Sequence, residues 1–361
     1  MKLMFTRRWL AALMALGLLL GMTACGEKEP EQTTAAPETT VEATTEPTTV
    51  PTTVPEETEP EEERFWLTFV GDCTFGASPA NYYAQLGFVK TVGEDYGYPF
   101  RNVIEWFEGD EFSFINLEGP LCDSGGPVQK THTFHGPTDF VNIITQNSVE
   151  FVSLANNHTL DYAQSGYDST VKTLQEAGVP YVERDASTIV TTPNGLKIGV
   201  YGAVYYHLDV EDMTAEIGAL KEAGCDLIVY APHWGFEKTY SPTEEQVFVG
   251  HAAIDAGADI VWGSHPHALQ PVESYGDGII YYSMGNFSFG GNAMPEDFDT
   301  AIIQQEVIRD GEGALRLGQT KIIPCSISSV DNTNNYQPTP LERSSEAYAR
   351  VLAKLGGTWS R

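Results

Sequence analysis

Side chains that can bind metal ions stand at the ends of apolar runs in this sequence. Carboxylate and amide oxygens and imidazole nitrogens are ligands for Mn, Fe, Zn and Mg in proteins. When two such ions share a bridging carboxylate, they hold the attacking and the leaving oxygen of a displacement reaction. They also lower the pKa of a water that bridges them. The sequence therefore predicts a centre with one or two divalent ions (Mn, Fe or Zn), and phosphoester hydrolysis is the chemistry that suits it. The predicted ligands are Asp72, Glu118, Asn157, His233, His265 and His267.

Two of these histidines, His265 and His267, are separated by a single residue. On a regular strand their rings would point to opposite faces of the sheet. Pro266 lies between them and predicts an irregular turn. Both rings could therefore reach one site.

Structural roles remain open for several of the polar residues. Asp72 could be a turn residue at a strand end, and Glu118, before Gly-Pro, could serve ordinary turn chemistry. His158 and Asp161 could cap the helix that follows them. The joint pattern of strand-end residues is what favours a shared polar site. The histidines that fit no strand end are interpreted as structural or exposed: His132, His135, His207 and His251.

The apolar runs that precede these residues read as strands, and helix-like stretches separate them. Helical periodicity or a glycine stop marks candidates at Asn102–Glu108, Asp139–Gln146, Tyr162–Ala177, Met213–Ala223 and Thr243–Ala256. Alternating strands and helices indicate an α/β fold with a largely buried sheet, and the late strands without helices indicate a mixed or antiparallel side. Ligands bind at the carboxyl ends of strands in such sheets, where the polar residues are expected. The strand candidates cover residues 65–72, 112–119, 149–158, 196–206, 225–235, 258–267, 278–289 and 300–324.

The first 25 residues have the features of a bacterial lipoprotein signal peptide. A basic start is followed by an apolar run from Trp9 to Leu20, and small residues precede Cys25. A transmembrane anchor is the alternative, but the run is shorter than the roughly 20 apolar residues that a span requires. We therefore expect a lipid on Cys25 and an extracytoplasmic protein anchored to the cell membrane.

Composition divides the rest of the chain. Residues 26–63 are mostly Thr, Pro and Glu and predict a disordered tether, because they have few apolar side chains to bury. Residues 64–330 are expected to form one domain, with 331–361 as a C-terminal extension. The formal charge of −30 includes twelve Glu and one Lys in the tether and three basic residues before it, which leaves −22 for residues 64–361. Nucleic acid is excluded as a partner, because its binding requires a basic surface.

Four cysteines besides Cys25 are widely spaced, without a C-x-x-C pair. An exported chain could join them in disulfides. Each also lies in or beside an apolar run, where a buried thiol is equally expected. We expect no structural disulfide and no zinc knuckle. These residues are Cys73, Cys122, Cys225 and Cys325.

Six segments, in this order, resemble the CapA (PgsA) family of poly-γ-glutamate capsule biosynthesis proteins, and the likeness covers about residues 65–307. They are Gly71-Asp72, Asn116–Leu121, Ser153–Tyr162, His233–Glu237, Gly263–Glu273 and Tyr282–Phe289. The resemblance implies a calcineurin-like metallophosphoesterase fold, a four-layer αββα sandwich with a dimetal site at the sheet edge. It implies that Asp72, Glu118 and His267 hold a first ion and that Asn157, His233 and His265 hold a second. It also implies that His158 is a general acid or phosphate binder, oriented by Asp161.

The sequence departs from the family pattern at the first predicted ion. The superfamily motif is Asp-x-His, but here Cys73 and Thr74 follow Asp72, so this ion loses an imidazole ligand. His135 stands where the family often has Arg, and an imidazole binds anions less well than a guanidinium. Ser264 stands where many members have another His.

Three functions follow as hypotheses. The first is a role in synthesis, export or anchoring of an anionic extracellular polymer such as poly-γ-glutamate, beside a membrane complex for capsule synthesis. The second is a metal-dependent phosphoesterase that acts on an extracellular phosphate ester. The third is a binding module that kept the fold without the chemistry. The charge of −22 is unfavourable for direct polyanion binding, so a bound divalent ion, or a local patch that the sequence does not reveal, would have to offset it.

Overall fold

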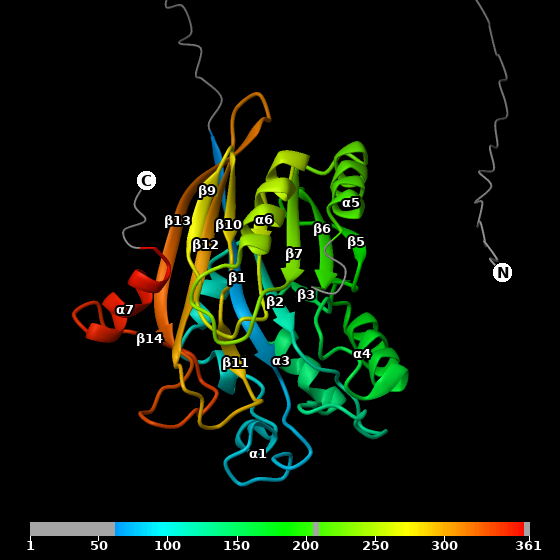
Figure 1. Cartoon of the computed structure of the whole chain (residues 1–361), viewed down its shortest axis with the longest axis vertical. Helices are drawn as coiled ribbons and strands as arrows, with labels where there is room; N and C mark the ends of the chain where they lie inside the picture. The colour runs from blue at the N-terminus through cyan, green and yellow to red at the C-terminus, as the bar shows by residue number, and fades with distance from the viewer. Residues whose placement is uncertain (1–61, 205–208, 357–361) are drawn as a thin grey trace, which may run out of the picture. The chain divides into compact units, whose positions relative to one another are not determined.

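The computed structural model describes residues 62–204 and 209–356. Within these ranges, no helix combines the length and the apolar composition that a membrane crossing requires. The predictions for the signal peptide, Cys25, nearly all of the tether and His207 lie outside the described residues. The described chain forms two β-sheets with helices against them (Figure 1).

The first sheet joins eight strands of the described residues. They are β1 (Glu63–Thr74), β2 (Phe112–Leu117), β3 (Phe151–Ser153), β4 (Tyr181–Val182), β11 (Asn286–Phe289), β12 (Asp299–Arg309), β13 (Leu315–Ser326) and β14 (Thr339–Pro340). Their order is β14-β13-β12-β1-β2-β3-β4, and β11 pairs with β1. Strands β1 to β4 are parallel, whereas β12, β13 and β14 are antiparallel to their neighbours. This arrangement confirms the predicted mixed side of the sheet.

The second sheet joins six strands of the described residues, in the order β5-β6-β7-β8-β10-β9. They are β5 (Ala186–Thr191), β6 (Lys197–Val204), β7 (Leu227–His233), β8 (Ile260–Trp262), β9 (Val272–Tyr275) and β10 (Gly278–Tyr281). The four central strands are parallel, and β5 and β9 are antiparallel edges. The apolar run 278–289 thus divides between the sheets, because β10 lies here and β11 pairs with β1.

Alternating side chains along the central strands build the layers. Phe69 of β1 and Val200 of β6 belong to one core between the sheets, whereas Val70 and Tyr201, their neighbours in sequence, face the outer helices. The four-layer αββα sandwich is therefore confirmed. The first sheet is covered by α1 (Phe88–Val92), η1 (Tyr98–Phe100), α2 (Ile104–Glu108), η2 (Thr138–Phe140), α3 (Val141–Thr145) and α4 (Ala163–Ala177), and the second by α5 (Val210–Glu222) and α6 (Glu244–Ala256).

Local sequence signals fix the ends of the helices that flank the strand ends. Thr243 caps α6 through a reciprocal hydrogen-bond pair with Gln246. The helix stops at Gly257, which has a φ of 112° that favours glycine. Helix α4 stops in the same way at Gly178, with a φ of 71°. The predicted helix stops at both glycines are confirmed.

Residues after 330 complete the sandwich. Strand β14 pairs with β13, and α7 (Glu346–Lys354) packs on β12 and β13. Val351 and Leu355 are buried in the core between the sheets. Arg350 and Lys354 each lie 2.7 Å from Asp299 at the start of β12. The segment predicted as an extension, as far as it is described, therefore belongs to the same compact unit.

The four described cysteines are free thiols. Burial raises the pKa of Cys73 and Cys325 well above the usual range, and it raises the pKa of Cys122 to about 11. A protonated thiol in an apolar setting behaves as a small hydrophobic group. These side chains therefore serve packing.

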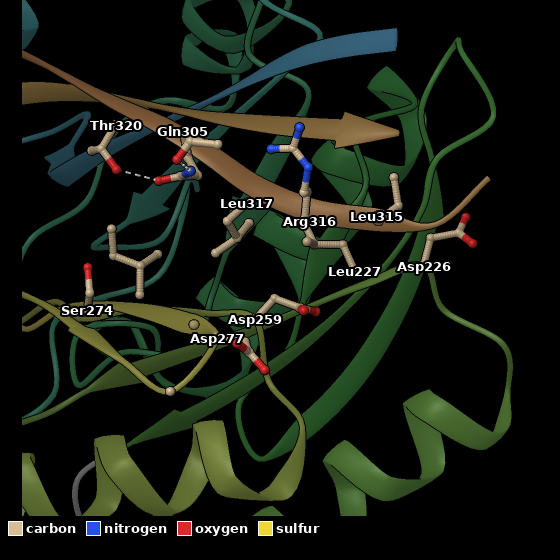
Figure 2. Close-up of a pocket in the computed structure, with 14 residues that line it drawn as sticks. Asp226, Leu227, Asp259, Ser274, Asp277, Gln305, Leu315, Arg316, Leu317 and Thr320 are labelled. Atoms are coloured by element: carbon tan, nitrogen blue, oxygen red, sulfur yellow. Dashed lines mark hydrogen bonds between the residues drawn. The ribbon is translucent and has the colours of Figure 1, made fainter. Parts of the chain in front are cut away.

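A cavity of about 410 Å³ lies where strands β7 and β8 begin (Figure 2). Asp226, Asp259 and Asp277 line it, with Leu315 and Leu317 of β13. Asp226 accepts a hydrogen bond from the backbone N–H of Lys197, and Asp259 accepts one from that of Ile228. These two carboxylates therefore fix the starts of strands.

Candidate metal centre

Polar side chains from both sheets meet at the edge where the parallel strands end. Asp72 lies near the end of β1, Glu118 directly follows β2, and Asn157 follows β3. From the other sheet, His233 is the last residue of β7, and the turn after β8 supplies His265 and His267. Contacts of 3.1 to 3.8 Å link five of the six predicted ligands to one another, and the His265 ring lies beside that of His233, with centroids 4.7 Å apart and planes tilted by 50°.

Glu118 stands at the centre of this group. Its side chain is fully buried, and neither carboxylate oxygen has a hydrogen-bond partner among the described residues. Three imidazole Nε2 atoms surround Oε1, from His158 at 3.8 Å, His233 at 3.8 Å and His267 at 3.7 Å. An isolated buried carboxylate is costly unless a cation accompanies it.

These distances fit a divalent ion. Oxygen and nitrogen atoms that bind one ion at about 2.0–2.2 Å lie at most about 4.3 Å apart. All three spacings around Glu118 fall within that limit. Asn157 Oδ1 also lies 3.1 Å from His233 Nε2. The donor set of one carboxylate, one amide and several imidazoles therefore fits the metal that the sequence predicts.

The two ring nitrogens of His267 face different partners. Its Nδ1 lies 2.9 Å from Asn286 Oδ1 and 3.1 Å from Asp72 Oδ2, and both oxygens accept hydrogen bonds. Nδ1 therefore keeps its proton, and Nε2, which faces Glu118, is the nitrogen available to bind an ion. The other oxygen of Asp72 accepts a hydrogen bond from Asn116 Nδ2 at 2.8 Å. In this arrangement Asp72 orients the His267 ring, and its role as a metal ligand stays a prediction.

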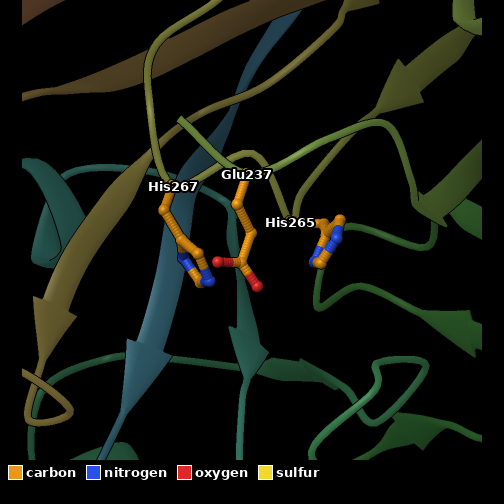
Figure 3. Close-up of side chains that lie close together, drawn as sticks. All are labelled: Glu237, His265 and His267. Atoms are coloured by element: carbon orange, nitrogen blue, oxygen red, sulfur yellow. The ribbon is translucent and has the colours of Figure 1, made fainter. Parts of the chain in front are cut away.

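Glu237 joins His265 and His267 in a second group of ligand type. One ligand atom from each residue lies within 4.8 Å of the others. Figure 3 shows the exposed Glu237 carboxylate between the two rings. His265 has a φ of 98° and His267 a φ of 54°, which are unusual for residues with a side chain. These φ values confirm the irregular turn predicted around Pro266. They also show that the backbone is strained at this site.

His158 belongs to a buried pair beside Glu118. Its Nδ1 lies 2.5 Å from Asp161 Oδ2, which also accepts the backbone N–H of Phe134. Lys130 Nζ donates to Asp161 Oδ1 at 3.0 Å. The carboxylate accepts the Nδ1 proton, so Nε2 of His158 is directed toward Glu118. A proton donor or an additional ligand could act from this position.

Burial and mutual contacts set the protonation of the centre. Burial lowers the pKa of His233 well below its ordinary value and that of His265 to about 4, and neighbouring histidines add to both shifts. Burial, only partly offset by Asp161, also lowers the pKa of His158. All three rings are neutral at pH 7, as metal ligands must be.

The pKa values of Glu118 and His267 are raised, in contrast to those of the three rings above. Burial raises the pKa of Glu118 to about 8, and the Asp72 charge adds to this rise. Burial disfavours the charged form of His267, but Glu118 and Asp72 outweigh it and raise the pKa of His267 to about 10. Without an ion, this pair therefore retains a proton at neutral pH.

Sequence reasoning missed three residues of this edge. Glu237 ends one of the segments that resemble the family, His233–Glu237. Nothing in the sequence indicates that the loop after β7 turns back toward His265 and His267. Lys130 lies in a loop without periodicity, and only its contact with Asp161 reveals it. His132 is exposed, as interpreted, yet it lines two cavities beside the centre.

The other histidines set aside from the site have partners elsewhere. His135 stacks between Tyr82 and Tyr162, with ring centroids 4.3 and 4.1 Å away. His251 stacks on Tyr275 and lies 3.1 Å from Glu273. The interpretation of these two rings as structural is confirmed.

Sequence comparisons associate the chain with proteins of bacterial capsules. The model of the family described as bacterial capsule synthesis protein PGA_cap matches residues 66–291. The capsule biosynthesis protein CapA of Bacillus anthracis is 29% identical over 285 residues, which are 71% of this chain and 67% of the relative. The PGA biosynthesis protein CapA of Bacillus subtilis (strain 168) is 26% identical over 314 residues, 80% of this chain and 77% of the relative.

Solved structures show weaker likeness. The sulfate thiohydrolase SoxB of Thermus thermophilus aligns with a TM-score of 0.40 and 13% identity, over 80% of this chain and 60% of that one. The purple acid phosphatase PPD1 from yellow lupin aligns with a TM-score of 0.33 and 10% identity, over 73% of this chain and 54% of that one.

Proposed function

Because the chain belongs to the bacterial capsule synthesis protein PGA_cap family, we propose that it acts in synthesis of a poly-γ-glutamate capsule, with a divalent-metal centre that engages the polymer. The family match over residues 66–291 supports the capsule role. The Glu118 carboxylate carries the metal part of the proposal, because it is buried, has no hydrogen-bond partner in the part of the chain that the structure describes, and is faced by three imidazoles.

A bound ion would also reduce the local electrostatic conflict between protein and polymer. The chain has a formal charge of −30, and poly-γ-glutamate bears a carboxylate on each unit. A divalent ion held by His233, His267 and Glu118 adds two positive charges at the sheet edge. When bound, it polarises an oxygen of its ligand and makes a nearby water more acidic.

The test is metal-dependent polymer binding by the full-length chain. We expect the chain loaded with Mn, Fe or Zn to bind poly-γ-glutamate at least about ten times more tightly than the chain stripped with EDTA. Poly-α-glutamate controls for charge alone, and metal content per chain is measured in parallel. Equal binding with and without the ion, or no binding, would contradict the proposal.

The His158–Asp161 pair favours a second candidate function, a metal-dependent phosphoesterase. Nε2 of His158 lies 3.8 Å from Glu118 Oε1, and once this nitrogen is protonated it could give that proton to a leaving oxygen. Hydrolysis of simple phosphate esters by the metal-loaded chain, lost in His158→Asn, supports this candidate. Polymer binding without any hydrolysis leaves the binding module as the better description.

We also propose that a lipid on Cys25 anchors the chain to the outer side of the cell membrane. The order of basic, apolar and small residues before Cys25 supports this anchor. We expect Cys25→Ala to move the protein from the membrane fraction to the soluble fraction and to abolish labelling by an alkyne fatty acid. Retention of both properties in the variant contradicts a lipid at Cys25.

A further inference from the structure

Two cavities adjoin the metal centre and share part of their walls. One, the Met294 lobe, has a volume of about 490 Å³ and is lined by His267, Phe289 and Met294 among others. The second, the Phe236 lobe, has a volume of about 410 Å³ and is lined by Asn157, His265 and Phe236 among others. The shared wall residues are His132, His158 and Glu237.

The shared wall borders the metal centre. His158 Nε2 lies 3.8 Å from Glu118 Oε1, and the Glu237 carboxylate lies between the rings of His265 and His267 (Figure 3). A group bound at the centre therefore has free space on two sides. Each lobe alone has the volume of a small-molecule pocket. The combined volume of the two lobes exceeds the volume that a single small ester occupies. It suits a ligand that extends from the centre into both lobes.

The two lobes offer the same kinds of contact. Each has an exposed apolar side chain at its rim, since Phe236 is 64% and Met294 67% exposed. Each also has one lysine, but Lys130 of the Phe236 lobe already donates to the buried Asp161 at 3.0 Å. Lys238 of the Met294 lobe pairs with the exposed Glu296 at 3.2 Å, a pairing that is weak in water, and Glu237 and Asp297 line the same lobe. The apolar rims of the two lobes match the aliphatic segments of a long chain, and a carboxylate of that chain would be bound by an ion at the centre rather than by the lobes.

We propose that an internal segment of an extended, carboxylate-bearing polymer crosses the metal centre, with its two arms in the Phe236 lobe and the Met294 lobe. This inference rests on the proposed function and adds the mode of recognition. The centre engages the polymer along its length, and Phe236 and Met294 are binding residues for the two arms. A ligand recognised at a chain end would need one lobe alone.

The experiment compares γ-glutamyl oligomers of increasing length on the full-length, Mn-loaded chain. We expect affinity to rise with length until both lobes are filled and then to level off. Phe236→Ala and Met294→Ala should each weaken binding of long oligomers by about 5- to 10-fold and leave single-unit binding unchanged. Phe248→Ala is the matched control, because Phe248 is 65% exposed on α6 and lines neither lobe.

The outcomes separate this inference from the proposed function. Two results would show that the site recognises a chain end: affinity that does not depend on oligomer length, or a loss of affinity in only one of the two lobe variants. Either result overturns binding of two arms, but the proposed binding of the polymer still stands. Absence of binding by every oligomer to a chain that holds its metal overturns the proposed function as well. Metal content of each variant, measured alongside, shows that the centre is intact.

Discussion

Glu118→Gln is expected to abolish tight metal binding while the chain remains folded. The amide has nearly the shape of the carboxylate but no charge, and it removes the group around which three imidazoles gather. Loss of a residue that only orients a metal ligand typically costs about 10- to 100-fold in metal affinity, and loss of this central carboxylate should cost more than 100-fold. Isothermal titration with Mn²⁺ or Zn²⁺ measures the affinity directly.

The matched control is Glu273→Gln. Glu273 also pairs with a histidine, His251 at 3.1 Å, but it lies on β9 away from the strand ends that form the centre. We expect wild-type metal affinity in this variant. Wild-type affinity in Glu118→Gln would show that the ion binds elsewhere and would remove the basis of the proposed function.

The same variant should also change the pH dependence of metal binding. Burial raises the pKa of Glu118 to about 8, so the ion-free centre holds a proton that an incoming ion must displace. Metal affinity of the wild type therefore increases as the pH rises toward about 8. This increase should be smaller in Glu118→Gln, because the amide has no proton to lose.

Gly71→Ala is expected to destabilise the fold more than any surface change. A Cβ at this position would lie 2.0 Å from the backbone oxygen of Gly285 and 2.6 Å from that of Met284. Strands β1 and β11 would have to move apart, which should cost about 2–3 kcal/mol of unfolding free energy. Because Asp72 and Asn286 are paired across these strands, metal affinity should fall as well.

Gly218→Ala provides the opposite control for this prediction. Gly218 lies within α5, and a Cβ there would meet nothing within 4 Å. Alanine should therefore stabilise the protein by about 0.5–1 kcal/mol, because it favours the helix over the unfolded chain. Urea denaturation of the two variants and the wild type measures both effects, and equal midpoints would contradict the close approach of β1 and β11.

Much of the site was predictable because strand periodicity and strand ends are local features. The apolar run before Asp72 and the run before His233 end at the same sheet edge, as the pattern predicts. Pro266 correctly predicts a break between His265 and His267. The family resemblance supplied the order of the layers, which periodicity alone does not determine.

The remaining features depend on contacts between segments that are distant in sequence. The run 278–289 has no sequence signal for a change of sheet, because the reason is the contact of Gly285 with Gly71 of β1. Glu237 follows His233 by four residues but reaches the turn after β8 only through the path of its loop. The hydrogen bond from Asn116 to Asp72 joins two strands and is visible only once these are paired.

Strand β1 runs from the start of the described domain to the metal centre. The described chain enters the sandwich at the start of β1, and Asp72 lies nine residues beyond Glu63. At about 3.3 Å per residue, the entry point and the metal centre are about 30 Å apart, at opposite ends of one strand. The cavity of Figure 2 lies at the entry end, where its lining residue Arg316 pairs with Glu62 at 2.8 Å. A restraint on the preceding segment would therefore hold the domain at the end opposite the proposed metal centre, and that centre would stay accessible.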